Sequence, residues 1–240
     1  MATSGRRRFL TTATLALLVP LAGALWVSRG LTAEPATELP AAKLDPPAAG
    51  EGLETAVLAG GCFWGVQAVF QHVKGVKQAL SGYSGGKKAA SYYEVATGAT
   101  GHAESVQVKF DPKEISYGEI LRIFFSVAHD PTQVDRQGPD EGPQYRSAIF
   151  YRNEAQRSVA QAYIKQLDEA GVFKAPIATR LDPLSAFYPA EDYHQDYLIH
   201  HPNNPYIVYN DLPKIENLKR LFSSIYRTEP VTVASAAKTL

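Results

Sequence analysis

The stretch Gly61-Cys62-Phe63-Trp64-Gly65 holds the only cysteine of the 240-residue chain, with two large aromatic residues directly after it and glycines on both sides. The apolar run at 55–59 comes just before it and is typical of a buried strand. After it, four apolar residues recur at the spacing of one helix face: Val66, Val69, Phe70 and Val73. The pattern predicts a strand that turns into a helix at Cys62.

Cys62 would then lie at a helix N-terminus, beside unpaired backbone N–H groups and the positive end of the helix dipole. Such a position favours a thiolate, so we expect the pKa of Cys62 to be lowered. The alternative is a small buried apolar residue, because free cysteines are among the most buried residue types. A single cysteine excludes an intramolecular disulfide and a zinc site built from several thiolates.

The composition describes a globular chain without a dominant charge. Its length suits one domain with appendages, and 45% hydrophobic residues are ample for a packed core. Because 24 basic and 24 acidic residues cancel, no overall field favours binding to nucleic acid. We expect a monomer without a nucleic-acid partner.

The amino-terminal part differs from the rest of the chain. The basic run Arg-Arg-Arg-Phe-Leu at 6–10 precedes an uncharged stretch at 11–27, which indicates a twin-arginine-like export signal over 1–28. We therefore expect an exported, periplasmic protein; the alternative is an uncleaved membrane anchor through 11–27. Residues 29–52, rich in Ala and Pro, are predicted to be a tether, and 227–240 a tail without pattern.

The body predicts an α+β fold. Over Ala103–Phe110 the residues alternate sharply, and four of them share one face: Glu104, Val106, Val108 and Phe110. Further strands are expected at 76–83, 145–151 and 177–181, and helices after the Ser116/Glu119 capping box, at 154–170, at 191–200 and at 213–223 behind an Asp211 cap. The order strand, helix, strand, strand, helix, strand predicts a two-layer α/β plait with a ferredoxin-like split βαβ core and long wrapping loops.

Glu104 is the second residue of chemical interest. Its alternation with apolar residues predicts a carboxyl group on the core-facing side of a strand. Burial disfavours the ionised form, so we expect a raised pKa and a group able to act as a general acid at neutral pH. The alternatives are a solvated Glu104 at the mouth of the strand, or a Glu104 paired with Arg146.

Other chemistries compete for the same residues. His102, Glu104 and His194 provide the two imidazoles and one carboxylate that hold mononuclear iron. Cys62 and His194 with an aspartate would suit a hydrolase. A third alternative is an exported peptide-binding module with a structural Cys62. The aromatic residues in the loops indicate a cavity for a small ligand that pairs a methyl group with a polarised oxygen.

Five blocks of sequence, at 61–65, 82–86, 101–104, 140 with 144–147, and 190–197, resemble the A-type peptide-methionine (S)-S-oxide reductases. The resemblance covers about residues 53–226, which would be the catalytic domain. It implies a plait with long loops, Cys62 as the nucleophile that attacks the sulfoxide sulfur, and Glu104 as the acid that protonates the sulfoxide oxygen. It implies seven substrate-binding residues: Phe63, Trp64, Tyr83, Asp140, Tyr145, His194 and Tyr197.

Within that set, the resemblance implies that Tyr83 and Tyr145 hydrogen-bond the sulfoxide oxygen, and that Phe63 and Trp64 hold the methyl group. The substrates would be oxidised proteins or peptides and free methionine sulfoxide, in antioxidant protein repair. No bound cofactor and no metal are implied. Many relatives carry further cysteines near the carboxyl terminus that resolve the sulfenic acid, and the corresponding region at 204–209 has none. We therefore expect an external thiol, thioredoxin-like or small, to reduce Cys62.

Overall fold

A computed structural model describes Met1 and residues 36–47 and 50–238. The chain divides into two units, 1–30 and 31–240, and every element given below belongs to the second. The export signal or anchor predicted at 1–28, with its apolar stretch at 11–27, lies outside the described residues, apart from Met1. The helices of the described part include none with the length and apolar character needed to cross a membrane.

Six strands form one sheet in the order β7-β6-β1-β3-β2-β8. They are β1 (Glu54–Gly60), β2 (Val76–Ser84), β3 (Ala103–Phe110), β6 (Ser147–Tyr151), β7 (Arg180–Pro183) and β8 (Phe187–Pro189). Neighbouring strands are antiparallel except for the parallel pair β6 and β7. The central order β6-β1-β3-β2 is that of a split βαβ core, so the predicted plait is confirmed. A separate ladder joins β4 (Arg136–Gln137) and β5 (Asp140–Glu141).

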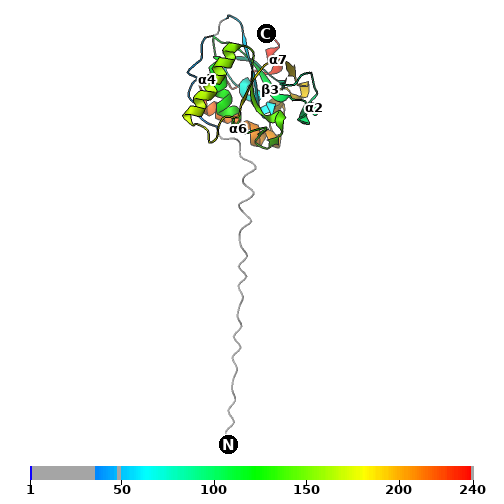
Figure 1. Cartoon of the computed structure of the whole chain (residues 1–240). Helices are drawn as coiled ribbons and strands as arrows, with labels where there is room; N and C mark the ends of the chain where they lie inside the picture. The colour runs from blue at the N-terminus through cyan, green and yellow to red at the C-terminus, as the bar shows by residue number, and fades with distance from the viewer. Residues whose placement is uncertain (2–35, 48–49, 239–240) are drawn as a thin grey trace. The chain divides into compact units, whose positions relative to one another are not determined.

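The α-helices are α1 (Phe63–Gln71), α2 (Tyr92–Ala96), α3 (Tyr117–Ile123), α4 (Glu154–Ala170), α5 (Tyr197–His200), α6 (Leu212–Leu221) and α7 (Val233–Ala236). Two π-helical turns, Phe124–Ala128 and Ile207–Asp211, continue α3 and precede α6. Two 3-10 turns, Pro143–Tyr145 and Asp192–His194, lie in the long connections. Figure 1 shows α4 as a long helix at one side of the body, with β3 inside the body.

The two faces of the sheet are covered differently. Along β1, Ala56 and Leu58 belong to a large apolar cluster that includes residues of α1, α3 and α4, so these helices cover this face. Val57 and Ala59 point to the other face, into a small cluster that packs against Phe187 of β8 and the loop before it. Each fully buried large side chain stabilises such a core by roughly 1.5–3 kcal/mol. Because the cluster on the helix side is much the larger of the two, most of the core lies between the sheet and the helices.

Strand register brings the site residues to one end of the sheet. Tyr83 on β2 lies directly opposite Glu104 on β3, so the two side chains share a face. Leu58 on β1 lies opposite Val106 on β3, which places the end of β1 beside the Glu104 end of β3. Because Cys62 follows β1 after a two-glycine step, the thiol and the carboxyl group reach the same edge.

Several element boundaries differ from those predicted. The strand expected at 177–181 is β7 at 180–183, and β8 at 187–189 forms where no strand was predicted, because a three-residue strand is too short for a periodic pattern. Ser116 does cap α3 by accepting the Glu119 N–H, but the Glu119 carboxylate pairs with Arg122, so the capping box is only half formed. The side chain of Asp211 does not cap α6.

The two predicted appendages also pack on the body where they are described. In the expected tether, Leu39 is 1% exposed, and Asp45 accepts hydrogen bonds from Ser116 and the Gly118 N–H at the start of α3. In the expected tail, the Val233 N–H donates to Asp196 at 3.1 Å. The prediction of a loose tether is therefore wrong for 36–47, and the tail contains the short helix α7.

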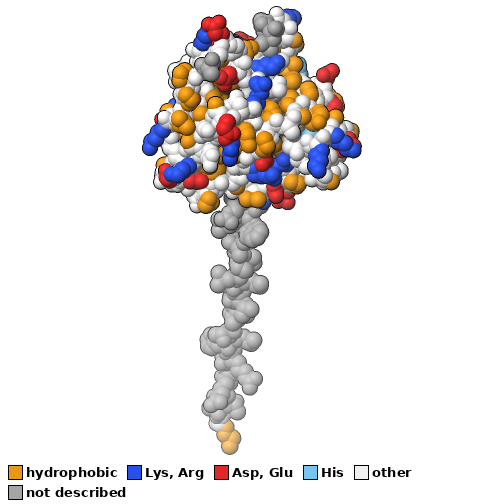
Figure 2. All heavy atoms as spheres, turned by 45° about the horizontal axis from the view of Figure 1, so that its top comes forward, with side chains coloured by type: hydrophobic (Ala, Val, Ile, Leu, Met, Phe, Trp, Pro, Cys, Tyr) orange, Lys and Arg blue, Asp and Glu red, His pale blue; other side chains and the backbone are white. Residues whose placement is uncertain are grey.

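Charge on the surface agrees with the balanced composition. On the face shown in Figure 2, basic and acidic side chains are interspersed rather than gathered into one field. A patch of one sign, of the kind that attracts nucleic acid, is not seen on this face.

Candidate active site

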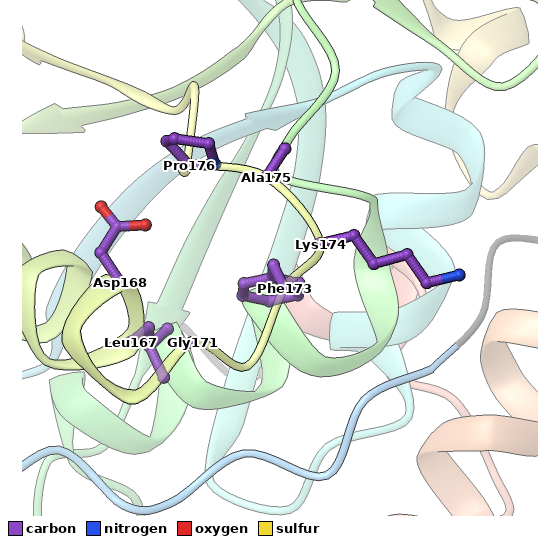
Figure 3. Close-up of a pocket in the computed structure, with 7 residues that line it drawn as sticks. All are labelled: Leu167, Asp168, Gly171, Phe173, Lys174, Ala175 and Pro176. Atoms are coloured by element: carbon purple, nitrogen blue, oxygen red, sulfur yellow. The ribbon is translucent and has the colours of Figure 1, made fainter.

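The structure contains a shallow pocket whose lining residues lie outside the five sequence blocks. It has a volume of about 410 Å³ and lies at the end of α4, where Asp168 provides its one carboxyl group (Figure 3). That carboxylate accepts a hydrogen bond from the Ile177 N–H at 3.0 Å and so fastens the local loop. The pocket lining contains no nucleophile with a neighbouring acid, so the candidate active site lies at Cys62 instead.

Cys62 immediately precedes α1, as predicted, and is buried with 8% of its surface exposed. The turn that aims it depends on Gly61, whose φ of +85° is strained for residues with a side chain. A Cβ on Gly61 would also lie 2.5 Å from the Cβ of Gln137. The glycine therefore lets the end of β1 turn sharply under the β4 segment and present the thiol at the start of the helix.

The prediction of a lowered Cys62 pKa is wrong. Burial raises the pKa of the thiol well above its ordinary value, and the charges of Glu104, Asp211 and Asp140 raise it further. A backbone N–H at Trp64 acts in the opposite direction but is outweighed. The helix start does favour the thiolate, but three nearby carboxyl groups oppose it. Cys62 is therefore a thiol at neutral pH.

Glu104 has the environment that its strand position predicts. Its side chain is 3% exposed, and its Oε2 accepts a hydrogen bond from the Phe63 N–H at 3.1 Å, the first peptide group after Cys62. Burial raises its pKa to about 8, although the Phe63 N–H opposes the shift. The alternative of a solvated Glu104 is wrong because the residue is buried. The alternative of an Arg146 partner is wrong because Arg146 donates to backbone carbonyls. A protonated acid thus lies beside the thiol.

Tyr83 and Tyr145 both lie near Glu104. The buried Tyr83 donates its hydroxyl to Glu191 at 2.9 Å, and burial together with this bond raises its pKa. The half-buried Tyr145 has its pKa raised by burial and then by the charges of Glu104 and Asp140, which places it near both. Tyr92 is a further neighbour: burial, Glu104 and Cys62 raise its pKa to about 12. Three phenols therefore surround the acid.

An aromatic wall adjoins Cys62. Trp64 stacks on Tyr197, with ring centroids 3.7 Å apart and planes 7° from parallel. The Trp64 indole N–H donates to Nδ1 of His194 at 3.2 Å, and the His194 ring lies 5.1 Å from that of Phe63. Four residues predicted for the site are therefore in mutual contact. They form an aromatic surface at the start of α1, and two of them, Phe63 and Trp64, directly follow the thiol in the chain.

Asp140 completes the predicted set from the β5 side. It is half-buried, burial raises its pKa, and it accepts a hydrogen bond from the Tyr206 hydroxyl. Tyr206 also packs edge-on against Trp64, with ring centroids 5.9 Å apart. The structure thus brings all nine predicted site residues together around the start of α1, either in direct contact or through shared neighbours.

Sequence reasoning missed the buried ion pair under this helix start. Asp211 is fully buried and its Oδ1 accepts from Lys214 Nζ at 3.2 Å. A Cβ on Gly65 would lie 2.1 Å from the same Oδ1, so the second glycine of the Gly-Cys-Phe-Trp-Gly block makes room for this carboxylate. Burial raises the pKa of Asp211 to about 6, and Lys214 opposes the shift. A polar pair at i and i+3 was the signal available in the sequence.

Glu191 was also missed, although it lies inside a block that the sequence singled out. It accepts from the Tyr83 hydroxyl through one oxygen and from the Tyr92 N–H through the other, at 2.9 and 2.8 Å. Gln195, further along the same block, bonds to both the N–H and the carbonyl of Ser81 at 3.0 Å. The 190–197 block is therefore fastened to β2 and holds its aromatic residues against Trp64.

The geometry does not favour the iron and hydrolase hypotheses. Within the described ranges, no three His, Cys, Asp or Glu side chains lie close enough together to bind a metal ion. His102 accepts from the Gly86 N–H at 3.2 Å and uses its other nitrogen on the Lys88 carbonyl at 2.9 Å, so both its nitrogens face the backbone. His194 accepts from Trp64, and none of its hydrogen bonds within the described part involves an aspartate that could orient it as a base.

Comparison with known proteins decides between the reductase and the peptide-binding hypotheses. A family model described as peptide methionine sulfoxide reductase matches residues 54–225. The chain belongs to the peptide methionine sulfoxide reductase family. It is 58% identical over 190 residues to peptide methionine sulfoxide reductase MsrA 2 of Mesorhizobium japonicum, a match that covers 79% of this chain and 97% of the relative. It is 50% identical over 175 residues to MsrA of Thermus thermophilus, with 72% and 98% covered.

Solved structures agree with this assignment. The reduced form of Mxr1 from Saccharomyces cerevisiae matches with a TM-score of 0.58 and 32% identity, over 68% of this chain and 92% of that one. Methionine sulfoxide reductase A of Corynebacterium diphtheriae matches with a TM-score of 0.55 and 34% identity, over 73% and 90%. As a family member, the chain is an enzyme that reduces methionine sulfoxide, and the iron and peptide-binding alternatives are not favoured.

Proposed function

We propose that Cys62 and Glu104 carry out the reduction of methionine S-sulfoxide, free or within a polypeptide, and that an external thiol restores the enzyme. The observation that carries the proposal is the Phe63 N–H···Oε2 hydrogen bond of 3.1 Å, which holds a carboxyl group with a pKa of about 8 against the peptide after Cys62. Glu104 is then mostly protonated at neutral pH, and a sulfoxide oxygen needs a proton before it can leave sulfur.

The first step converts methionine sulfoxide and the Cys62 thiol into methionine and a Cys62 sulfenic acid. The Cys62 sulfur attacks the sulfoxide sulfur and forms an S–S bond while Glu104 protonates the oxygen. The hydroxyl then passes to the Cys62 sulfur as the S–O and S–S bonds to the substrate sulfur break, which releases methionine and leaves the sulfenic acid. The thiol is protonated at rest, so its proton must leave during the attack. Glu104, having given its proton to the oxygen, is a carboxylate that can accept the thiol proton, and the protons balance.

The surroundings support this charge movement. Tyr83 and Tyr145 border Glu104 and are proposed to donate hydrogen bonds to the oxygen as negative charge grows on it. Because a phenol has one donor, Tyr83 must turn its hydroxyl from Glu191 to the substrate oxygen to do so. Phe63 and Trp64 provide apolar contact for the methyl group on the sulfur. Fixing the methyl group on one side and the oxygen on the other selects one of the two sulfoxide epimers.

Asp140, His194 and Tyr197 are proposed to shape the site rather than to react. Tyr197 and His194 fix the Trp64 ring by stacking and by accepting the indole N–H. Asp140 orients the Tyr206 hydroxyl from the opposite side. These contacts keep the apolar wall in one position, which lowers the cost of ordering the substrate.

Recovery needs two external thiol groups, from two small thiol molecules or from one dithiol, because the chain has no second cysteine. The first thiol displaces water from the sulfenic acid and forms a mixed disulfide with Cys62. The second releases Cys62 as a thiol and leaves as the disulfide of the reductant. A thioredoxin-like protein or a small thiol fits this scheme equally well, and both are consistent with the site.

The test compares wild type, Cys62→Ser and Glu104→Gln with methionine S-sulfoxide and dithiothreitol. The proposal expects Cys62→Ser to lose turnover and Glu104→Gln to lose about a hundredfold or more. Glu114→Gln serves as a matched control, because this glutamate is half exposed and pairs with Lys77 at the surface. Turnover that survives in Cys62→Ser would reject the proposal, and if a chelator then abolished it, iron chemistry would replace the thiol.

A second test isolates the sulfenic acid. Wild type given excess methionine S-sulfoxide without reductant should form roughly one methionine per chain and then stop, since each Cys62 reacts once before it needs a thiol. A 1,3-dione reagent should label Cys62 at that stage. Multiple turnovers without added thiol would contradict the single-cysteine scheme.

We also propose that the enzyme is exported and repairs proteins outside the cytoplasm, on the basis of the basic run at 6–10 and the uncharged stretch after it. Replacing Arg6 and Arg7 by lysine should then leave the protein inside the cytoplasm. Equal amounts of both versions in the periplasmic fraction would contradict the proposal.

A further inference from the structure

The guanidinium group of Arg146 is buried with 6% of the residue exposed, and it binds only backbone carbonyls. Nη1 donates to the carbonyls of His102 and Pro143 at 3.1 and 2.8 Å, and Nη2 donates to the carbonyl of Gly101 at 3.0 Å. None of the ion pairs formed by the described residues includes Arg146. A buried arginine normally has an acidic partner or a special reason to be there.

The three carbonyls belong to segments that carry site residues. Gly101 and His102 lead into β3, and His102 lies two residues before Glu104. Pro143 opens the 3-10 turn Pro143–Tyr145, which ends at the phenol beside Glu104. The Pro143 carbonyl also accepts the backbone N–H of Arg146 at 3.3 Å, so Arg146 binds this carbonyl through both its backbone and its side chain.

A third segment rests on the same guanidinium. Gly85 follows Tyr83 by two residues and has a φ of +99°. A Cβ on Gly85 would lie 2.6 Å from Nη2 of Arg146 and 3.1 Å from the Gly101 carbonyl. The glycine-rich turn after β2 therefore packs its backbone directly on the Arg146 side chain.

We propose that Arg146 is a positioning residue that sets the mutual placement of Glu104, Tyr145 and Tyr83. It touches the backbone within two residues of each of them, and its planar fork satisfies carbonyls of two chain segments at once. It acts through these residues and does not contact the reacting atoms. The inference rests on the proposed function, because it matters for the rate only if Glu104 supplies the proton.

A lysine cannot replace this arginine. Its single ammonium group has three donors at one point, whereas the guanidinium spreads its donors over a rigid plane that reaches all three carbonyls. The structure therefore expects Arg146→Lys to keep the charge and lose the placement. A misplacement on the order of 1 Å near the reacting atoms costs about a hundredfold in rate.

The experiment measures kcat and KM for methionine S-sulfoxide with dithiothreitol in Arg146→Lys and Arg146→Ala. We expect kcat to fall by about a hundredfold in Arg146→Ala while KM changes by less than about threefold, because the lost contacts align the acid rather than bind the substrate. Guanidinium ion, at a concentration well below the denaturing range, should restore part of kcat in Arg146→Ala by filling the vacated position.

Arg122 provides the matched control. It is half-buried and donates to the Leu39 carbonyl at 2.7 Å, so Arg122→Ala also removes an arginine–carbonyl bond. Urea denaturation of both alanine variants gives the loss of stability. Arg122→Ala should lose stability, keep kcat, and gain nothing from guanidinium ion.

Two results overturn the inference. If Arg146→Ala is folded and has the kcat of wild type, that result alone overturns the inference, provided that Glu104→Gln has lost its activity. A fall in kcat that guanidinium ion does not relieve, and that matches the fraction unfolded, reduces Arg146 to a structural residue. If Glu104→Gln keeps its rate, the proposed function fails first, and this inference fails with it.

Discussion

Two buried carboxyl groups, Glu104 and Asp211, flank the first turn of the same helix and are held in opposite ways. Glu104 is 3% exposed and accepts one backbone N–H; Asp211 is fully buried and accepts from the ammonium group of Lys214. Burial raises both pKa values, to about 8 for Glu104 and to about 6 for Asp211. At neutral pH the first is mostly protonated and the second mostly ionised.

The comparison shows that burial alone does not decide what an acid can do. Both groups are desolvated, but only Asp211 has a cation beside it, and the cation keeps its pKa below neutrality. The charge of Asp211 then raises the pKa of Glu104 in turn. Glu104 therefore keeps a proton that it can donate, and Asp211 keeps a negative charge that helps Glu104 to stay protonated.

The largest expected effect is on stability, in Asp211→Asn. Removing one member of a buried ion pair typically costs about 3–5 kcal/mol, whereas replacing both members is often close to neutral. Urea denaturation should therefore show a large loss in Asp211→Asn and partial recovery in the double variant Asp211→Asn with Lys214→Met. A single variant as stable as wild type would mean that the pair contributes nothing and that the two acids do not differ as described.

Glu104→Gln should show the reverse pattern. The rate should fall by about a hundredfold or more, which corresponds to about 2.7 kcal/mol of transition-state stabilisation, while the free energy of unfolding at pH 7 should not fall. The amide oxygen of glutamine can still accept the Phe63 N–H, so the local structure is kept. A destabilised Glu104→Gln with an unchanged rate would exchange the roles of the two acids.

A smaller effect is expected in Gly65→Ala. The new Cβ would lie 2.1 Å from Asp211 Oδ1 and 3.0 Å from Lys214 Nζ, so the ion pair must move away from α1. Overpacking of this kind costs about 1–3 kcal/mol, measurable as a lower unfolding midpoint. The matched control is Gly171→Ala, where a Cβ meets nothing within 4 Å but the φ of +61° is strained, so the cost there reports backbone strain alone.

The last expected effect is a slope of stability against pH. The folded-state pKa of Glu104, about 8, lies above its ordinary value of 4.5, so the folded state binds this proton more tightly. The resulting stability is complete below pH 4.5 and is lost as pH rises towards 8, by about 1.4 kcal/mol per pH unit within that window. Wild type minus Glu104→Gln should show this slope. For Asp211 the corresponding window runs only from 3.8 to 6.

The sequence predicted the central fold because its signals are local. The alternation in Ala103–Phe110 and the apolar faces around Cys62 are strong periodic patterns, and they gave the order of the plait and the inward direction of Glu104. The strand at 187–189 and the packing of 36–47 could not be predicted in this way. Both depend on partners far along the chain, β2 for the first and α3 for the second.

The difference between local signals and contacts far along the chain also explains which features of the site were predicted. Cys62 and Glu104 were predicted because a turn and a strand place them. The pKa of Cys62 was predicted in the wrong direction because the helix start is a local feature, whereas the burial of the thiol and then the charges of Glu104, Asp211 and Asp140 arise only in the folded chain. The binding of three backbone carbonyls by Arg146 could not be predicted either, because these carbonyls become neighbours only in the folded chain.

The protonation state of Glu104 at neutral pH tests the account most directly. Infrared spectroscopy detects the carbonyl stretch of a protonated carboxyl group, and the difference between wild type and Glu104→Gln isolates this residue from Asp211. The account predicts a protonated carboxyl band at pH 7 that disappears around pH 8. A band that is already absent at pH 6, with titration near the ordinary value of 4.5, would contradict it.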